Sequence, residues 1–341
     1  EPVTIHNNEL FLIETAFQKG YMKPRIPEVR SGKKVAVIGS GPAGLAVADQ
    51  LNHRGHQVTV YERDDRVGGL LMYGIPNMKL DKSVIERRKN LMETEGVIFK
   101  TGQNIGENVS ATDILKDFDA VALCCGAKKP RPLAVKDADK VQEVCYAVDF
   151  LSSTTQSLLN ASLRDGTYIS AKGRNVVIVG GGDTGNDCVG TCIRHGCKSV
   201  TQLEMMPEPP AEREASNPWP EWPKVLKTDY GQEEAIAQFG QDPRIYETTV
   251  KELILKAGKL SAIKTVKVRF ENRQMVEIAG TEQTIKCELL LIAAGFIGCQ
   301  NYTADAFGVK LSGANTVQTA EEKYRTSVSK VFTAGDMHRG Q

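Results

Sequence analysis

The sequence predicts an α/β protein made of two parallel-sheet domains, the second inserted in the first. Residues 33–51 (KKVAVIGSGPAGLAVADQL) have the pattern of a buried strand, a glycine-rich turn and a helix, and residues 175–188 (NVVIVGGGDTGNDC) repeat it. A short apolar strand at 328–333 is expected to return to the first domain. This order of elements is typical of Rossmann-like domains, and we expect two of them, of the three-layer ββα type.

Composition excludes several classes of protein. The 341 residues are 41% hydrophobic and 25% charged, and the net charge of +1 argues against binding to nucleic acid or an anionic membrane through bulk charge. No apolar run approaches the roughly 18 residues that a membrane span needs. The N-terminus has no signal-peptide pattern. Eight cysteines without a C-x-x-C pair indicate reduced thiols in a cytoplasmic protein rather than a metal or disulfide framework.

The first domain is expected to follow an N-terminal segment, residues 1–32. Residues 8–20 have the pattern of a short helix, and the prolines in 21–32 mark a linker. The strand, turn and helix of the first repeat are expected at 33–38, 39–44 and 44–54, and further strands at 57–62 and 119–125. A last strand that ends close to Gln341 normally has a covering helix after it, so we expect the natural polypeptide to continue.

The second domain is expected to contain parallel strands at 172–179, 200–204 and 287–294, and antiparallel strands within 246–270 and 275–278. Proline density makes 207–223 an irregular segment with a functional or interface role. We therefore place the first domain at 33–140 and 296–341, and the second at 141–295.

The first glycine loop has the residues of a phosphate-binding turn. Gly39 suits a tight turn, Gly41 a close approach to pyrophosphate, and Gly44 close packing of the helix on the strand. The N-terminus of that helix offers free N–H groups to phosphate. An acidic residue at the end of the next strand is placed to bind ribose hydroxyls. The candidate residues here are Gly39, Ser40, Gly41, Pro42, Ala43, Gly44, Glu62 and Arg63.

The second loop repeats these features. Gly180, Gly182 and Gly185 take the three glycine positions, Asp183 and Thr184 lie in reach of a pyrophosphate, and Glu204 corresponds to Glu62. An acidic residue there repels a 2′-phosphate and favours NADH over NADPH. Arg213 in the following loop is a possible partner for that phosphate, so NADH and NADPH both remain possible.

Two dinucleotide sites on one chain are typical of a flavoprotein that holds FAD in one site and binds a nicotinamide in the other. Segment 66–76 adds a second glycine-rich apolar stretch after Glu62, and residues 335–336 follow the last strand, so we assign FAD to the first site. Glycines at the ends of two buried strands complete the sets. The additional candidates are Gly69, Leu70, Ile75, Pro76, Gly126, Gly335 and Asp336 for FAD, and Gly295 for NAD(P)H. We name no catalytic acid or base and no metal ligand, because the cofactors carry the chemistry.

Several other residues have more than one possible role. Cys188 and Cys192 are spaced to share a metal, but small buried side chains are favoured. Lys79 and Asp81 contact the flavin or cap a helix, and His338 touches the flavin edge or is exposed. Trp219 and Trp222 shield the nicotinamide, form an interface or pack within their loop.

Five stretches together resemble the small (beta) subunit of NAD(P)H-dependent glutamate synthase, or the equivalent C-terminal region of the single-chain enzyme. They are GSGPAG at 39–44, GGLLMYGIP at 68–76, GGGDTGND at 180–187, NPWPEWP at 217–223 with DYG at 229–231, and AGDMHRGQ at 334–341. The glycine loops occur in many flavoproteins, whereas NPWPEWP is specific. The resemblance covers essentially the whole chain.

The resemblance implies an adrenodoxin-reductase-like fold with an NAD(P)H domain inserted in an FAD domain. It implies hydride transfer from NADH or NADPH to flavin N5. Electrons then pass through iron–sulfur clusters to FMN on a large subunit or N-terminal region, which makes glutamate from 2-oxoglutarate and glutamine. The family's N-terminal iron–sulfur cysteine region and its C-terminal end have no counterpart in these 341 residues, so we expect a trimmed core.

Two alternatives remain at this point. The first is a related flavin module, of a dihydropyrimidine dehydrogenase-like or ferredoxin-NADP reductase-like enzyme. The second, from another class, is a non-catalytic nucleotide-binding or scaffolding subunit, in which one of the two sites takes no cofactor.

Overall fold

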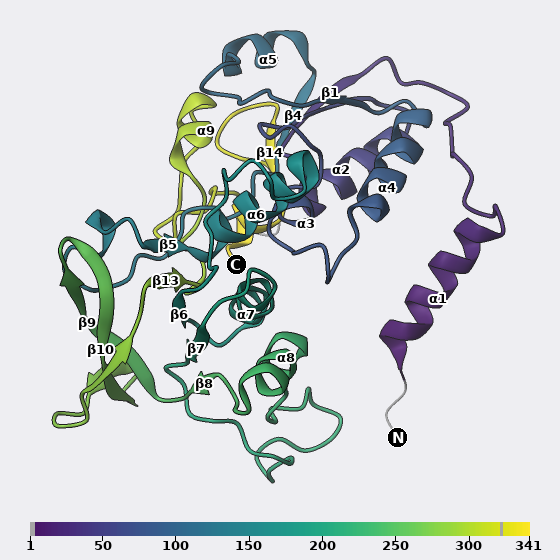
Figure 1. Ribbon diagram of the computed structural model, residues 1–341. Helices are drawn as coiled ribbons and strands as arrows, with labels where there is room; N and C mark the ends of the chain where they lie inside the picture. Colours follow the sequence, from purple (N-terminus) through teal and green to yellow (C-terminus); the bar gives the residue numbers. More distant parts are fainter. Residues whose placement is uncertain (1–3, 321–322) are drawn as a thin grey trace. The chain divides into compact units, whose positions relative to one another are not determined.

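The computed structural model describes residues 4–320 and 323–341 (Figure 1), so the first three residues of the predicted N-terminal segment lie outside the described residues. The described parts of 1–71, 81–128 and 297–341 form a first compact unit, and 72–80 with 129–296 form a second. These limits differ from the expected domains, because residues 72–80, 129–140 and Phe296 belong to the second unit. Their contacts are with residues distant in sequence, which local patterns do not reveal.

The first unit contains a five-stranded parallel sheet. Its strand order is β14 (Val331–Thr333), β4 (Ala120–Leu123), β1 (Lys34–Ile38), β2 (Gln57–Tyr61) and β3 (Ile98–Lys100). The last strand thus returns to the first domain, as predicted. Sequence patterns missed β3, because its three residues are exposed or half-buried and carry no apolar alternation. Its helices are α1 (Ile5–Gln18), α2 (Pro42–His53), α4 (Lys82–Thr94), α5 (Ala111–Asp117), α9 (Asn301–Ala306) and α10 (Asp336–Arg339).

Alternate residues of β1 pack on opposite faces of this sheet, which is why the strand is apolar throughout. Val37 lies in a cluster with Ala48 of α2 and Met92 of α4. Ile38 lies in the other cluster, with Phe307 and Met337 from the C-terminal segment. Because side chains cover both faces of the sheet, β1 is held firmly in place. The first glycine loop begins at its end.

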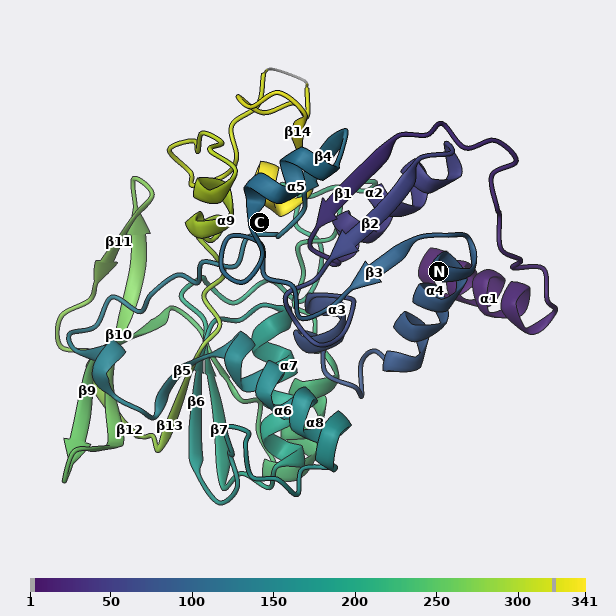
Figure 2. The same ribbon diagram turned by 90° about the horizontal axis from the view of Figure 1, so that it is seen from above.

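The second unit has a parallel sheet of the same size. Its order is β5 (Val144–Tyr146), β13 (Leu289–Ile292), β6 (Asn175–Val179), β7 (Ser199–Leu203) and β8 (Arg244–Ile245). Helices α6 (Ala147–Ala161), α7 (Asp183–Arg194) and α8 (Tyr230–Phe239) cover one face (Figure 2). The other face is covered by an antiparallel sheet of β9 (Thr248–Lys256), β10 (Lys259–Glu271), β11 (Gln274–Glu277) and β12 (Gln283–Lys286).

The packing of β6 confirms the predicted three-layer ββα architecture for the second unit. Ile178 packs with Phe150 and Val189 from the helices, whereas its neighbour Val177 packs with Ile263 of the antiparallel sheet. The predicted strand region 246–270 proves to be two strands joined by a turn at residues 257–258. Both turn residues have positive φ, 51° and 76°, as a tight hairpin turn requires.

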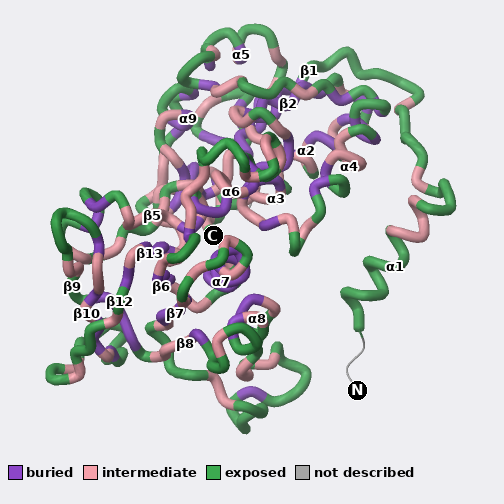
Figure 3. The backbone as a smooth tube through the Cα atoms, viewed as in Figure 1, coloured by how far each residue is buried: buried purple, intermediate pink, exposed green. Residues whose placement is uncertain are grey.

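Three shorter elements complete the chain. They are α3 (Leu70–Tyr73), where the chain passes from the first unit to the second, the 3₁₀ turn at Ala138–Lys140, and the hairpin turn at residues 257–258. Figure 3 shows that β6 and β13, at the centre of their sheet, are buried, whereas α1 is exposed or half-buried along its length. Glu14 ties α1 to α4 through a bidentate pair with Arg87, at 2.7 and 2.8 Å. Across 4–320 and 323–341, no helix has the length and apolar content needed to cross a bilayer.

Candidate functional site

The three glycines of the first loop have three separate physical roles. Gly39 has φ +98°, and a Cβ there would lie 2.6 Å from the Cys124 carbonyl oxygen, so only glycine fits this turn. A Cβ at Gly44 would overlap the Gly39 carbonyl, which explains the close packing of α2 on the loop. A Cβ at Gly41 would meet no protein atom within 4 Å. The absence of a side chain at Gly41 therefore serves something other than the protein's own packing.

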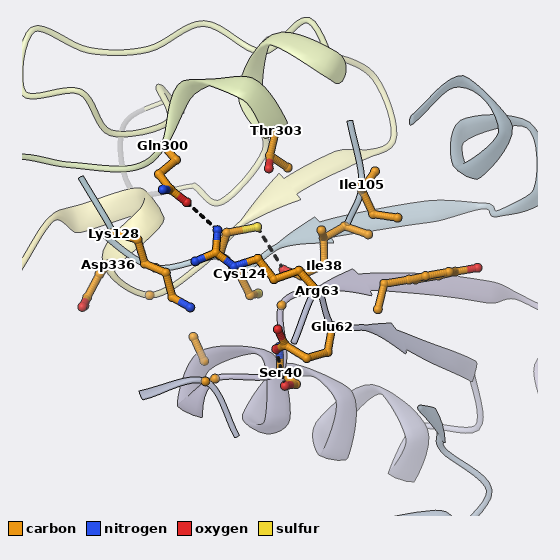
Figure 4. Close-up of a pocket in the computed structure, with 18 of the residues that line it drawn as sticks. Ile38, Ser40, Glu62, Arg63, Ile105, Cys124, Lys128, Gln300, Thr303 and Asp336 are labelled. Carbon is orange, nitrogen blue, oxygen red and sulfur yellow. Dashed lines mark hydrogen bonds between the residues drawn. The ribbon is translucent and has the colours of Figure 1, made fainter. Parts of the chain in front are cut away.

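A cavity of about 340 Å³ lies above this loop, within the range of small-molecule sites. Figure 4 shows side chains from the strand ends and from the C-terminal segment around it. The structure brings most of the predicted flavin-binding residues together here. Those lining the cavity are Gly39, Ser40, Gly41, Pro42, Ala43, Glu62, Arg63, Gly69, Leu70, Gly126, Gly335 and Asp336.

Three predicted residues do not line the cavity. Gly44 packs behind the loop, as described above. Ile75 and Pro76 belong to the segment 72–80, which the structure groups with the second unit. Their assignment to the first site rested on proximity in sequence to Gly69, and the chain leaves that unit after Leu71.

Glu62 forms hydrogen bonds with the backbone around the first glycine loop. The whole residue is only 4% exposed. One oxygen accepts hydrogen bonds from the Ser40 N–H (3.0 Å) and hydroxyl (2.5 Å), and the other accepts from the Asp64 N–H (2.9 Å). The predicted ribose acceptor is therefore also the group that holds the loop backbone in place.

The sequence did not predict several of the residues that line the cavity. Three of them form a hydrogen-bonded chain with Arg63, which was predicted. Arg63 Nη1 donates to Gln300 Oε1 (2.6 Å) and lies 3.3 Å from the Tyr302 hydroxyl, which in turn donates to Asn104 Oδ1 (2.9 Å). The end of β4 was recognisable as a neighbour of the glycine loop, whereas residues 300–303 carry no motif. The missed lining residues include Gln103, Asn104, Ile105, Cys124, Cys125, Lys128, Gln300, Tyr302 and Thr303.

The two cysteines that follow β4 are held as thiols by their surroundings. Burial raises the pKa of both Cys124 and Cys125 to about 12. Both thiols therefore stay protonated at neutral pH, and a protonated thiol is a poor nucleophile. This cavity offers shape, charge and hydrogen bonds and no thiolate.

The second loop repeats the first at the level of individual atoms. The Gly181 N–H donates to one oxygen of Glu204 (2.9 Å) and the Met206 N–H donates to the other (2.8 Å), as the Ser40 and Asp64 N–H groups do with Glu62. Gly180 has φ +126°, and a Cβ at Gly182 would meet no atom within 4 Å. The duplication predicted from sequence therefore extends to the geometry of the loop.

The other predicted residues of the second loop lie around it. Asp183 and Thr184 open α7, and a Cβ at Gly185 would overlap the Gly180 carbonyl, as at Gly44. Gly295 follows β13 and its carbonyl accepts from the Arg131 N–H (3.0 Å).

Arg213 is used by its own loop. Its guanidinium donates to the carbonyl oxygens of Asn217 (3.2 Å) and Glu221 (2.8 Å). Asn217 is buried and binds the Trp222 carbonyl (3.0 Å), which holds this segment in shape. Trp219 and Trp222 are 82% and 78% exposed, and Lys227 Nζ lies 4.4 Å from the centroid of the Trp222 ring.

The remaining ambiguous residues have clear partners. Lys79 Nζ lies 3.1 Å from Asp187 Oδ1 in the second unit, whereas Asp81 caps α4 by accepting from the Ser83 N–H (2.8 Å). His338 is hydrogen-bonded to Thr319 (2.8 Å). Cys188 and Cys192 are fully buried in the apolar cluster, the reading favoured from sequence.

His195 gives the second unit a predicted pH dependence. Its ring packs edge-on against Phe150 and Tyr168, its Nδ1 accepts from the Ala171 N–H (3.3 Å), and burial lowers its pKa from 6.5 to about 4. Between these values the unfolded chain binds a proton that the folded chain does not, so stability falls as pH falls. We expect a loss of about 1–2 kcal/mol between pH 7 and 5, measured by urea unfolding.

The matched variant for this test is His195→Gln, which retains a hydrogen-bond acceptor and cannot titrate in this range. Its stability should be less sensitive to pH over the same interval. An equal loss in both proteins would assign the pH dependence to other groups.

Comparison with known proteins gives a consistent result. Residues 33–221 match the family Pyridine nucleotide-disulphide oxidoreductase. The chain is 45% identical to "Glutamate synthase [NADH]" of Schizosaccharomyces pombe, over 100% of this chain and 16% of that protein. It is 46% identical to "Glutamate synthase [NADPH] small chain" of Bacillus subtilis, over 99% of this chain and 70% of that protein. The chain thus spans a small part of the first relative and about two thirds of the second.

Solved structures share the fold at lower identity. Mycobacterium tuberculosis FprA in complex with NADPH has a TM-score of 0.68 at 16% identity, covering 90% of this chain and 79% of that one. T. acidophilum thioredoxin reductase has a TM-score of 0.59 at 20% identity, covering 91% and 92%. Both likenesses support the predicted two-domain fold.

Proposed function

We propose that this chain, which belongs to the pyridine nucleotide-disulphide oxidoreductase family and to the glutamate synthase small-chain family, is an NAD(P)H-dependent flavoprotein oxidoreductase. Its two glycine loops hold FAD and NAD(P)H respectively. The observation that carries this proposal is the repeated loop geometry. Each loop has a peptide N–H bound to an acidic residue at the end of the next strand, and a central glycine whose Cβ direction is open. One chain that repeats such a loop is built for two dinucleotides.

The cavity of the first unit suits FAD. Gly41 leaves room for a pyrophosphate at the N-terminus of α2, and Glu62 lines the cavity with hydrogen-bonding capacity for ribose. Arg63 and Lys128 add positive charge to the same cavity. When bound, FAD supplies the ring that accepts a hydride from NAD(P)H. The residues of the chain bind and orient it.

The loop of the second unit suits a nicotinamide dinucleotide. Gly182 leaves the N-terminus of α7 open in the same way, and Asp183 and Thr184 begin that helix. Glu204 takes the place of Glu62. We assign Gly180, Gly182, Asp183, Thr184, Gly185, Glu204 and Gly295 to this cofactor.

The partner follows from the relatives. In the single-chain relative the matching part is only 16% of the protein, so the rest of the enzyme lies elsewhere in that chain. We place the acceptor of the electrons on a large subunit or N-terminal region that carries FMN and iron–sulfur clusters. There they would support glutamate synthesis from 2-oxoglutarate and glutamine. A cytoplasmic location agrees with eight free thiols among the described residues.

The test is anaerobic reduction of the flavin-loaded protein. The purified protein is incubated with FAD, freed of excess, and mixed with NADH or NADPH while the flavin absorbance is followed. We expect stoichiometric flavin and its bleaching by at least one nicotinamide. Flavin that binds but is bleached by neither would contradict the oxidoreductase assignment.

The control is the Gly182→Ala variant, which alters only the second loop. It should retain flavin and lose most of the bleaching rate. Glutamate formation from 2-oxoglutarate and glutamine, measured with the full-length protein or its large subunit added, tests the proposed partner separately.

A further inference from the structure

A buried chain of three hydrogen bonds connects the start of α8 with the second glycine loop. The Asp229 N–H donates to Gln232 Oε1 (2.8 Å), Gln232 Nε2 donates to Gln202 Oε1 (3.1 Å), and Gln202 Nε2 donates to the Gly180 carbonyl (2.9 Å). Gln202 is 0% and Gln232 3% exposed. Each amide donates at one end and accepts at the other, so all three bonds point the same way and strengthen one another. We call these two side chains the glutamine relay.

The relay holds one edge of a peptide group whose other edge is also held. Gln202 binds the carbonyl of the Gly180–Gly181 peptide, and Glu204 accepts from the N–H of the same peptide (2.9 Å). A glycine-glycine peptide has wide conformational freedom. With both edges bound to residues of one strand end, its orientation is set before any ligand arrives.

The first unit shows that the loop fold does not need the relay. The strand registers pair Ile38 with Tyr61 in the first sheet and Val179 with Leu203 in the second, so Gln202 occupies the position of Val60. Val60 is fully buried and apolar. The first loop nevertheless forms the same bond from its N–H to Glu62. An apolar residue at this position is therefore enough for the loop to form. A buried polar side chain such as Gln202 indicates a role other than folding of the loop.

We propose that Gln202 and Gln232 are positioning residues for the nicotinamide cofactor: they fix the Gly180–Gly181 peptide so that the loop is preformed for pyrophosphate. This inference rests on the proposed assignment of NAD(P)H to the second loop. A cofactor that must bind and leave at every turnover gains most from a site that needs no ordering. A flavin that stays bound needs this less, which agrees with Val60 in the first unit.

The relay also connects the loop to residues 205–229. That segment begins after Glu204 and ends at Asp229, whose N–H is the first donor of the relay. Asp229 and Gln232 form a reciprocal capping box at the N-terminus of α8. The same two side chains thus connect the C-terminal end of this segment with the Gly180 carbonyl.

The first test is Gln202→Val, which copies the residue of the first unit. We expect the dissociation constant of NADH, titrated by its fluorescence, to rise about tenfold, the effect of losing one well-formed hydrogen bond. The KM for NADH should rise in parallel. The rate of flavin bleaching at saturating NADH and the flavin content should stay close to those of the wild type. The melting temperature should fall, because the Gly180 carbonyl and the Gln232 amide each lose a buried partner.

A second variant separates the relay from the helix cap. Gln232→Glu keeps an acceptor for the Asp229 N–H, and glutamate is a normal capping-box residue at this position. Its carboxylate cannot donate to Gln202, so the relay is interrupted and the dissociation constant should rise as in Gln202→Val. Gln238→Val, on the exposed face of the same helix, is the control and should bind NADH as the wild type does.

The inference is overturned if NADH binds both relay variants with wild-type affinity. It is also overturned if flavin content and saturated rate fall together with affinity, since that pattern denotes a structural role only. If Gln202→Val fails to fold, Gln232→Glu decides the matter by the same measurements. A wild-type protein that binds NADH but is not reduced by it would contradict the proposed function, while the titrations would still judge the relay.

Discussion

The Gly41→Ala variant is expected to lose flavin while the first unit stays folded. Gly41 has φ −66°, which any residue adopts, and its added Cβ would meet no protein atom within 4 Å. The backbone of Gly41 lines the cavity, so that methyl group would occupy space the ligand needs. We expect flavin affinity to fall at least about tenfold, equivalent to about 1.4 kcal/mol. Flavin-to-protein ratio after gel filtration and the thermal unfolding midpoint measure the two effects.

The matched control is Gly39→Ala, two residues earlier in the same turn. It combines φ +98° with a Cβ placed 2.6 Å from the Cys124 carbonyl oxygen. The free energy of unfolding should therefore fall by about 1–3 kcal/mol, and the thermal unfolding midpoint should fall with it. Full flavin content in Gly41→Ala would show that the loop does not approach the pyrophosphate as proposed. A destabilised Gly41→Ala would show that the cradle has a packing role.

The protein is expected to use NADH in preference to NADPH. Glu204 stands where a ribose 2′-substituent is read in this loop type, and its negative charge opposes a 2′-phosphate. Arg213, the cation that offered the opposite preference, has its guanidinium bound to main-chain carbonyls of its own loop. We expect kcat/KM for NADH to exceed that for NADPH by about tenfold or more.

Glu204→Gln tests the cause of this preference. It retains an acceptor for the Gly181 N–H and removes the charge, so the NADH-to-NADPH ratio should fall by about tenfold. Arg213→Lys should leave the ratio unchanged, because the arginine serves the shape of its loop. A wild-type preference for NADPH that is lost in Arg213→Lys would reverse the assignment and make that arginine the 2′-phosphate partner.

Much of the site was within reach of sequence reasoning. The two loops, their acidic partners and the return of the last strand follow from patterns of a few residues, and the structure has them where they were expected. Gly44 and Gly185 are examples, since each is required by an atom of a residue five positions earlier. Ile75 and Pro76 do not line the cavity and belong to the second unit, so their contact with the flavin stays a prediction.

The sequence by itself determined the fold class, the duplication and the position of the two glycine-rich turns, because these depend on alternation of apolar residues and on short-range steric limits. Only the tertiary structure decided which distant side chains complete each site. Arg63 meets Gln300, 237 positions away, and Gln202 meets Gln232, 30 positions away. These partners are selected by how strands and helices pack, and an isolated glutamine in a sequence carries no mark of the carbonyl it will bind. The physical reason is that hydrogen bonds between side chains need a geometry that only the folded sheet and its helices supply.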